Sequence, residues 1–226
     1  MSIGRKELKF YLNRFDAKIL KAQLARVMVQ DDNSVGTNGY FIRSLYFDSF
    51  DNRDYRHKVA GVEPREKFRI RYYNFDTQHL KFEIKSKRGD RIFKQSQNIS
   101  VEVCNGIVDH NRFPQDQSIF LKNIEQHFHR YGYSPKVTVD YYRDAYVLKG
   151  SSLRITFDEH VTAMPGSRGF FSDFPSPLSA IDSNLCILEV KYDRFLPSFA
   201  QTILNSHNLT RLSISKYSHA RLHALS

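Results

Sequence analysis

Four basic side chains alternate along the stretch REKFRIRYY: Arg65, Lys67, Arg69 and Arg71. Successive side chains of a β-strand point to opposite faces, so this spacing places all four on one face of a strand. The other face carries Glu66, Phe68, Ile70 and Tyr72. Cations held this close repel one another unless an anion lies between them. The stretch therefore predicts a strand that binds a polyanion.

The next strand-like stretch, HLKFEIKSK, has a similar pattern. One face carries Leu80, Phe82 and Ile84, and the other carries Lys81, Glu83, Lys85 and Lys87, with Arg91 and Lys94 following soon after. The formal net charge of the chain is +10, and residues 65–94 hold ten Lys or Arg against four Asp or Glu. The basic excess is therefore concentrated in one part of the chain, as expected for a site rather than for general solubility.

Composition narrows the class of protein. With 226 residues, of which 41% are hydrophobic, the chain can bury a full core, and we expect one domain spanning residues 1–226. Cys104 and Cys186 are the only cysteines, which suits a reducing compartment, so the expected location is the cytoplasm. No run of eighteen apolar residues occurs, so any membrane association would come through a partner or a longer parent chain.

The residue pattern predicts consecutive antiparallel strands with several helices, and it shows no internal repeat. Apolar residues at helical spacing, capping residues such as Asn13 or Asp16, and Gly132 as a C-cap predict helices at 16–28, 50–56, 118–131, 197–207 and 213–225. Alternating or β-branched stretches predict strands at 5–12, 41–49, 65–73, 79–87, 91–96, 134–148, 151–159 and 184–192. Turns are expected at 88–90 and 149–151, and loops at 31–39 and 162–183.

Several of these strands alternate charged with apolar residues, and two architectures accommodate that pattern. If the charged faces turn to bulk water, the chain is a sandwich with a polar exterior. If they turn inward, the sheet closes into a barrel with a charged, wet lumen. The residue pattern alone leaves both architectures open.

A family resemblance favours the closed barrel. The segments RKELKFYL, FIRSLYFDS, REKFRIRYY, KFEIKSKRGDRIFK, YYRDAY, LRITFD, LEVKYDRFLP and SKYS resemble, in the same order, the catalytic domain of the vacuolar transporter chaperone (VTC) complex, the polyphosphate polymerase branch of the triphosphate tunnel metalloenzyme (CYTH-like) superfamily. The resemblance covers nearly the whole chain. It implies an α+β fold, a closed antiparallel eight-stranded β-barrel with flanking helices, whose inward basic residues hold a triphosphate or polyphosphate with a divalent metal, Mn²⁺ or Mg²⁺.

The resemblance also implies site residues. Arg69 and Arg71 are expected to clamp phosphate oxygens, because guanidinium presents paired donors and stays charged. The other phosphate-binding candidates are Lys9, Lys85, Lys94, Arg143, Arg154 and Lys191, while Lys81, Lys87, Arg88 and Arg91 are expected at the rim. Arg143 and Arg154 could instead pair with a nearby carboxylate such as Asp140 or Asp158. Lys216, in SKYS, is expected at the tunnel mouth near the transferred phosphate, as a catalytic residue with Arg69 and Arg71.

Carboxylates in the expected lumen are the metal candidates. Glu189 alternates with Leu188 and Val190, so it should point inward together with Lys191, and hard divalent cations prefer oxygen ligands. Glu7 and Glu83 are further candidates that could simply hold neighbouring cations. The superfamily's N-terminal Glu-x-Glu-x-Lys reads here Arg5-Lys6-Glu7-Leu8-Lys9, so one carboxylate is replaced by a cation and the number of metal ions is open.

The leading hypothesis is therefore transfer of the γ-phosphoryl group of ATP to phosphate, pyrophosphate or polyphosphate. Three rivals stay open: an inorganic triphosphatase or polyphosphate hydrolase, a non-catalytic polyphosphate or inositol phosphate-binding module, and a nucleic-acid-binding protein. Nucleic acid is not the expected partner, because a basic tunnel accounts for the charge. The chain has no glycine-rich phosphate loop and no Gly-x-Ser-x-Gly elbow, which argues against the nucleotide and hydrolase sites built on those motifs.

Overall fold

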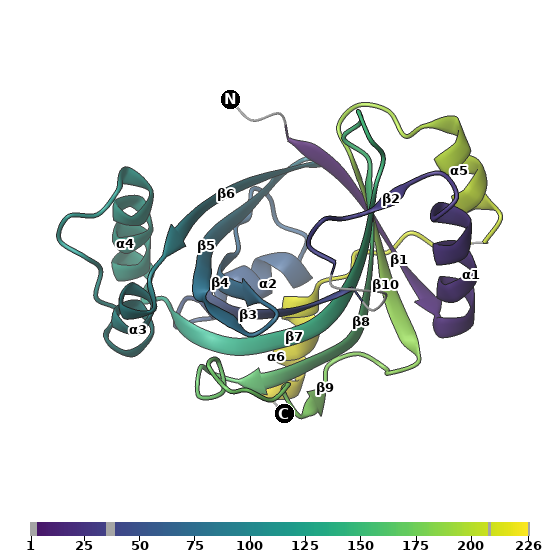
Figure 1. Cartoon of the computed structure of the whole chain (residues 1–226). Coiled ribbons are helices and arrows are strands. Elements are labelled where there is room, and N and C mark those ends of the chain that lie inside the picture. The colour runs from purple at the N-terminus through teal and green to yellow at the C-terminus, as the bar shows by residue number, and fades with distance from the viewer. Residues whose placement is uncertain (1–3, 35–38, 208, 226) are drawn as a thin grey trace.

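One antiparallel β-sheet closes on itself at the centre of the molecule (Figure 1). The computed structural model describes residues 4–34, 39–207 and 209–225. The strands are β1 (Arg5–Asn13), β2 (Val29–Gln30), β3 (Tyr40–Asp48), β4 (Phe68–Tyr73), β5 (Asp76–Arg88), β6 (Arg91–Ile99), β7 (Ser134–Val147), β8 (Arg154–Pro165), β9 (Leu178–Ser179) and β10 (Leu185–Tyr192). Eight of them pair in the cyclic order β1-β10-β8-β7-β3-β4-β5-β6, and β6 returns to β1. The expected eight-stranded barrel is confirmed, and the sandwich is excluded.

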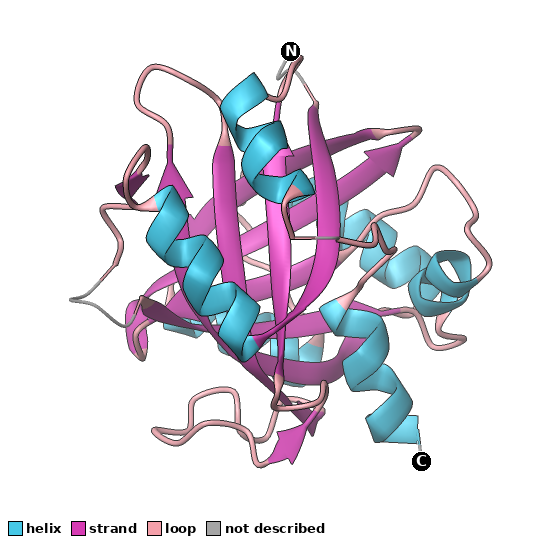
Figure 2. Cartoon of the chain, turned by 90° about the vertical axis from the view of Figure 1, so that its right-hand side faces the viewer, coloured by secondary structure: helices cyan, strands magenta, loops and turns pink. Residues whose placement is uncertain are grey.

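Helices cover the outside of the barrel. They are α1 (Arg14–Leu24), α2 (Arg53–Val59), α3 (Val101–His110), α4 (Ile119–Tyr131), α5 (Ser198–Asn205) and α6 (Lys216–Leu225). In Figure 1, α3 and α4 lie on one side of the barrel and α1 and α5 on the opposite side. Figure 2, viewed from the side of α1 and α5, shows these two helices lying across the outer face of the strands. Helix α6 packs on β7, β8 and α2, which brings the C-terminal segment to the barrel.

The element boundaries differ from the predicted ones in a few places. Helix α1 ends at Leu24 rather than at residue 28, and the predicted cap is Asn13, whose Oδ1 accepts from the Asp16 N–H at 2.8 Å. Helix α3 was not predicted, although Ser100 caps it. The expected loop at 162–183 is shorter, because β8 continues to Pro165 and pairs there with β9. Of the expected loop at 31–39, residues 35–38 lie outside the described part of the chain.

Alternation within the strands separates a dry shell from a charged lumen. The outward side chains of β4 and β5, including Phe68, Ile70 and Phe82, pack with Phe128 of α4 in one buried cluster. Leu188 and Val190 of β10 pack with Leu20 of α1 in a second cluster. The two clusters fix the two opposite faces of the barrel, so the charged residues between these apolar positions point inward.

A third buried cluster closes part of the lumen. Ile42, Tyr46, Val139 and Tyr141 of β3 and β7 pack there with Tyr217 of α6. Tyr217 also donates from its hydroxyl to Asp48 Oδ2 at 2.5 Å, and that carboxylate accepts from the backbone N–H groups of Asp54 and Tyr55 at the start of α2. Asp48 therefore holds β3, α2 and α6 together. This arrangement fixes where α6 begins, and α6 begins at Lys216.

Arg43 lies on the outer face of β3 and is fully buried. It pairs with Asp140 through two hydrogen bonds of 2.9 Å and donates to the carbonyl oxygens of Gly169 and Ser172. One guanidinium therefore fastens the segment after β8 to the barrel. This contact also removes Asp140 as a partner for the lumen arginines.

Among the described residues, none of the helices combines the length and the apolar character needed to cross a lipid bilayer.

Candidate functional site

The lumen of the barrel holds a cavity of about 1480 Å³. All the predicted phosphate-binding residues, the predicted catalytic Lys216 and two of the three metal candidates line it: Glu7, Lys9, Arg69, Arg71, Lys85, Lys94, Arg143, Arg154, Glu189, Lys191 and Lys216. The third metal candidate, Glu83, contacts Arg69 and Arg71 directly behind the lining. Of the expected rim residues, Lys81 and Lys87 also face the cavity, whereas Arg88 and Arg91 do not line it.

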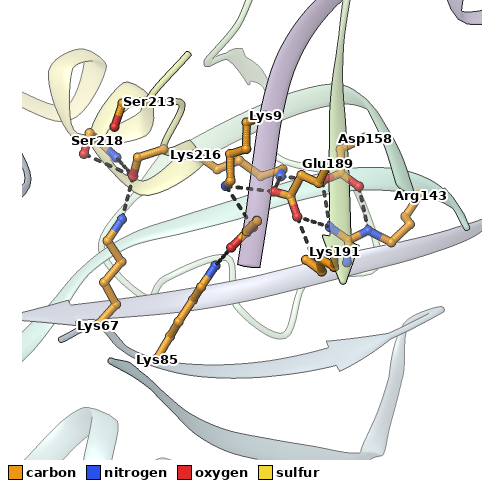
Figure 3. A network of polar contacts seen from close by, with 12 residues as sticks. Lys9, Lys67, Lys85, Arg143, Asp158, Glu189, Lys191, Ser213, Lys216 and Ser218 are labelled. Carbon is orange, nitrogen blue, oxygen red and sulfur yellow. Dashed lines mark hydrogen bonds and ion pairs between the residues drawn. The ribbon is translucent and has the colours of Figure 1, made fainter. Parts of the chain in front are cut away.

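Glu189 of β10 lies among four cations (Figure 3). Its Oε1 accepts from Lys9 Nζ at 2.9 Å and from Lys216 Nζ at 3.1 Å. Its Oε2 lies 2.9 Å from Lys191 Nζ and 3.7 Å from Arg143 Nη2. Burial raises the pKa of this carboxyl, but Lys191, Lys216 and Lys9 outweigh burial and lower the pKa well below its ordinary value. Glu189 is therefore a permanent anion at the centre of the site.

Asp158 of β8 is the second carboxylate in this region. Arg143 binds it with two hydrogen bonds, from Nε at 2.6 Å and from Nη2 at 2.7 Å, and the Lys216 ammonium also contacts it. The site prediction omitted Asp158 as a functional residue, although the two-residue spacing puts it on the same strand face as Arg154 and Thr156. The suggested pairing of Arg143 with this aspartate is present, and the same arginine still lines the cavity.

Lys216 is held by Asp158 and Glu189 together. Burial lowers its pKa, but the two carboxylates more than compensate, so the pKa lies above the ordinary value for lysine. The ammonium therefore keeps its proton at neutral pH. Lys216 can neutralise charge on a phosphate oxygen, but it cannot serve as a base.

Glu7 of β1 completes a group of three carboxylates on β1, β8 and β10. Its Oε2 accepts from Lys85 Nζ at 2.7 Å, and its buried Oε1 has no hydrogen-bond partner among the described residues, although Lys9 Nζ lies 3.4 Å away. Burial raises the pKa of Glu7, but Lys85 and Lys9 lower it to about 2. We call the inward surface of β1, β7, β8 and β10, which carries Glu7, Asp158 and Glu189, the carboxylate wall.

The facing surface belongs to β4, β5, β6 and the segment that leads into β4, and we call it the cation wall. Its carboxylates are few: Glu83 lies among the central cations, Asp76 of β5 also lines the cavity, and Glu63 contacts Arg65 and Lys87 at one end. Glu83 Oε2 accepts from Arg69 Nε at 2.9 Å, and Oε1 lies 2.8 Å from Arg71 Nη2 and 2.5 Å from Lys94 Nζ. Burial raises the pKa of Glu83, but these three cations lower it to about 2.

Arg154 is oriented differently from the other predicted cations. Its Nη2 donates to the Tyr40 hydroxyl at 2.9 Å, and its Nη1 pairs with Asp31, a residue that the sequence did not mark as a partner. Arg154 lines the cavity but is already neutralised by a carboxylate outside the carboxylate wall. Its role in phosphate binding stays a prediction.

The positive charge of the central site exceeds its negative charge. Eight cations contact four carboxylates in the ion pairs described above, which leaves a formal excess of four positive charges: the cations are Lys9, Arg69, Arg71, Lys85, Lys94, Arg143, Lys191 and Lys216. Charges in a partly dehydrated lumen interact more strongly than in bulk water. The arrangement is suited to a linear anion of several charges that threads between the two walls.

The carboxylate wall also fits a divalent cation. Glu7 Oε1 is a buried carboxylate oxygen without a hydrogen bond, and the Lys9 ammonium lies between it and Glu189 Oε1. Two hard oxygen donors suffice when phosphate oxygens and water supply the remaining ligands. Among the described residues, no group of three or more His, Cys, Asp or Glu side chains is arranged to hold a metal ion by itself, so most ligands of such an ion would come from substrate. For Glu83, surrounded by three cations, the role of metal ligand stays a prediction.

Sequence reasoning did not identify several side chains that position the site. Tyr46 accepts a hydrogen bond from Arg69 at 2.9 Å, and its ring packs on Tyr217 with centroids 5.3 Å apart. Lys58 of α2 and Ser215, just before α6, line the cavity as well. Helix α2 was placed only by local periodicity, and nothing in the sequence indicated that it would meet the lumen.

Comparisons with known proteins agree with this geometry. The family described as the VTC domain matches residues 4–224. No curated protein matches the sequence. A crystal structure of a candidate adenylate cyclase from Bacillus halodurans superposes with a TM-score of 0.53 at 13% identity, covering 92% of this chain and 94% of that one. A second candidate adenylate cyclase, from Vibrio parahaemolyticus, gives 0.50 at 11% identity, covering 97% and 98%. The two structures show the shared barrel fold, and the match over nearly all of the sequence places the chain in the VTC domain family.

Proposed function

We propose that this protein is a metal-dependent polyphosphate polymerase, which transfers the γ-phosphoryl group of ATP to phosphate, pyrophosphate or polyphosphate inside the barrel. The observation that carries the proposal is the excess of four positive charges in a closed lumen, where three of the four paired carboxylates gather on one wall. Phosphoryl transfer needs positioning and charge neutralisation more than covalent catalysis, because the transition state spreads charge over the equatorial oxygens. Membership of the VTC domain family supports the same class of reaction.

In the proposed step, a terminal oxygen of the acceptor attacks the γ-phosphorus in line with the bond to the leaving group. A new P–O bond forms, the bond between the γ-phosphorus and the β–γ bridging oxygen breaks, and ADP leaves with that electron pair. Arg69, Arg71 and Arg143 bind nonbridging oxygens and hold the triphosphate straight. The acceptor oxygen is already anionic, so the step needs no strong base, which agrees with a Lys216 that keeps its proton.

Glu189, together with Glu7, would hold the divalent metal ion, Mn²⁺ or Mg²⁺. When bound, that ion would supply Lewis-acid chemistry and neutralise part of the phosphate charge. The side chains around Glu189 have a second task. Lys9 and Lys191 fix both carboxylate oxygens, so the carboxylate stays ionised and oriented whether or not substrate is present.

The proposed ligands are ATP, pyrophosphate and polyphosphate, and all of them bind to one domain that spans residues 1–226. Nucleic acid has no role in it, because the cations counted above line an internal cavity rather than an outer face. A cytoplasmic location fits ATP as the donor and two free, buried cysteines.

The test is to incubate the purified protein with ATP, Mn²⁺ and pyrophosphate and to resolve the phosphate products by length on a gel. A ladder of long chains is expected. Free phosphate as the sole product would make the protein a triphosphatase or polyphosphate hydrolase. Unchanged ATP together with bound polyphosphate would make it a binding module. A protein that retains duplex DNA in the presence of short polyphosphate would contradict the tunnel as the anion site.

A further inference from the structure

Two lysines at one end of the cation wall lack the carboxylate partners that the central cations have. Lys67 donates from Nζ to Ser215 Oγ at 2.7 Å (Figure 3), and Lys58 donates to the Ser213 carbonyl at 3.0 Å and to its hydroxyl at 2.8 Å. Both lysines line the cavity. Within the described ranges 4–34, 39–207 and 209–225, no carboxylate oxygen forms an ion pair with either ammonium. Their hydrogen-bond partners are neutral groups of the segment before α6.

The strand register places further cations beside them. Lys67 and Lys85 are directly opposite, joined by backbone hydrogen bonds of 3.0 and 2.9 Å, and Arg65 is opposite Lys87 in the same way at 3.2 and 2.8 Å. Like charges directly across a strand pair destabilise a sheet. One level further along, Arg69 is opposite Glu83, where the charges match. Glu63 contacts both Arg65 and Lys87, and Glu7 binds Lys85, so Lys67 is the one cation of these two levels that forms no ion pair with a carboxylate among the described residues.

The electrostatics of Lys67 agree with this reading. Burial lowers its pKa most, and the positive charges of Lys9, Lys85, Lys58 and Arg65 lower it further, well below the ordinary value for lysine. These cations belong to β1, β5, α2 and the segment of Lys67 itself, and the Asp54 carboxyl at the start of α2 also acts on Lys67 electrostatically, without an ion pair. A phosphate group between Lys67 and Lys58 would raise the pKa of Lys67 again, so the pair is prepared for an anion that the protein itself does not supply.

We propose that Lys58, Lys67, Ser213 and Ser215 form an acceptor subsite, which binds the terminal phosphate of orthophosphate, pyrophosphate or a polyphosphate chain. The assignment rests on the proposed function, which requires two anions in one cavity. The carboxylate wall suits the anion that arrives with a metal ion, and a wall region whose lysines form no ion pair with a described carboxylate suits the anion that arrives without one. Ser215 directly precedes Lys216, whose ammonium contacts Asp158 and Glu189, so a phosphate held at Ser215 lies beside the proposed reaction centre.

The experiment measures pyrophosphate binding by calorimetry to the full chain already saturated with Mn²⁺ and an ATP analogue whose β–γ bridge is an imido group. The analogue occupies the donor position, so pyrophosphate reports on a second position. Lys67→Met is expected to weaken pyrophosphate binding on the order of tenfold, as for the loss of a charge-assisted hydrogen bond, while affinity for the analogue changes less than about twofold. Lys122→Met, on the exposed face of α4, is the matched control and should bind both ligands as the wild type does.

A second readout separates binding from a structural role. Wild-type protein should take up protons when pyrophosphate binds at alkaline pH, measured in buffers of different ionisation enthalpy, and Lys67→Met should take up fewer. Lys58→Gln should weaken pyrophosphate binding in the same direction.

The subsite is overturned if the loaded wild type binds no pyrophosphate, if Lys67→Met binds it unchanged, or if affinities for pyrophosphate and analogue fall equally. Lys67-dependent pyrophosphate binding in a protein that makes no polymer would refute the polymerase and retain the subsite. If the protein makes polymer and its Lys67→Met variant keeps its pyrophosphate affinity, the polymerase is retained and the subsite is refuted.

Discussion

The two walls of the lumen differ in how their buried cations are neutralised. The carboxylate wall surrounds Glu189, Asp158 and Glu7 with shared cations, so almost every charge there has a partner before any ligand arrives. On the cation wall Glu83 alone neutralises the central cations Arg69, Arg71 and Lys94 in the described ion pairs. Toward α2, Lys58 and Lys67 form no ion pair with a described carboxylate. The ion pairs of the carboxylate wall are therefore formed before any ligand binds, as catalysis and metal binding require. The lysines at the end of the cation wall gain a negative partner only when an anion binds.

The sharpest way to break this comparison is Glu189→Gln. The change leaves Lys9, Lys191, Lys216 and Arg143 without their common anion and removes the main metal candidate. Turnover is expected to fall about 1000-fold, equivalent to about 4 kcal/mol of barrier. The measurement is initial rate against Mn²⁺ concentration, with Glu102→Gln on exposed α3 as the control. Full activity in Glu189→Gln would remove this residue from the mechanism.

Glu83→Gln tests the cation wall by stability. Because the side chain of Glu83 is almost fully buried and neutralises three cations, its loss is expected to cost about 3 kcal/mol of unfolding free energy. Added tripolyphosphate should recover much of the loss, since it would supply the missing negative charge. Thermal unfolding with and without tripolyphosphate measures both effects. If the ligand stabilises Glu83→Gln no more than it stabilises wild type, the cation wall does not bind the anion.

Asp54 lies at the start of α2, just behind the end of the cation wall, and it makes stability depend on pH. Burial and the neighbouring charge of Asp48 raise its pKa to about 8. A carboxyl whose folded pKa lies above its unfolded value favours the folded state less as pH rises, so this penalty grows between about pH 4 and pH 8. Asp54→Asn should therefore raise the unfolding free energy by about 2 kcal/mol at pH 9 and change little at pH 4. Unfolding by denaturant at the two pH values measures this difference. An equal change in unfolding free energy at both pH values would exclude deprotonation of Asp54 as the cause.

Tyr217→Phe tests the contact that joins α6 to β3 and α2, and we expect it to have the smallest effect on activity and stability. It removes the hydroxyl that reaches Asp48 and should cost about 1 kcal/mol of stability. Since Tyr217 follows Lys216 in α6, kcat should fall a few-fold while the KM for ATP stays close to that of wild type. A change confined to KM would show that this tyrosine acts on binding rather than on the position of Lys216.

Much of the barrel could be predicted because alternation is a local property. The spacing of Arg69 and Arg71 against Phe68 and Ile70 was enough to assign their faces, and the observed clusters agree. Partner choice was not predictable, because it depends on register and closure. Arg154 was considered for a nearby aspartate and pairs with Asp31, far away in sequence, while Arg143 takes Asp158.

Helical elements were harder to predict than strands for a physical reason. Helix α3 is short, and the amphipathic signal in VEVCNGIVDH is interrupted by Gly106, so tertiary packing of Cys104 and Ile107 contributes what propensity does not. The contribution of α2 to the lumen depends on Asp48, whose backbone contacts appear only once β3, α2 and α6 meet.

Closure of the sheet makes the length of each strand a constraint on evolution. A one-residue deletion inside β4 would exchange its two faces, sending Arg69 into the shell and Phe68 into the lumen. An open sheet can absorb such a slip at its edge, but β4 lies inside a ring of eight strands that closes where β6 pairs with β1. Register already shifts at three places, between Tyr46 and Phe47, between Arg71 and Tyr73, and between Asp140 and Tyr142. Insertions and deletions should therefore be accommodated at these bulges, while elsewhere the barrel strands can change only by substitution.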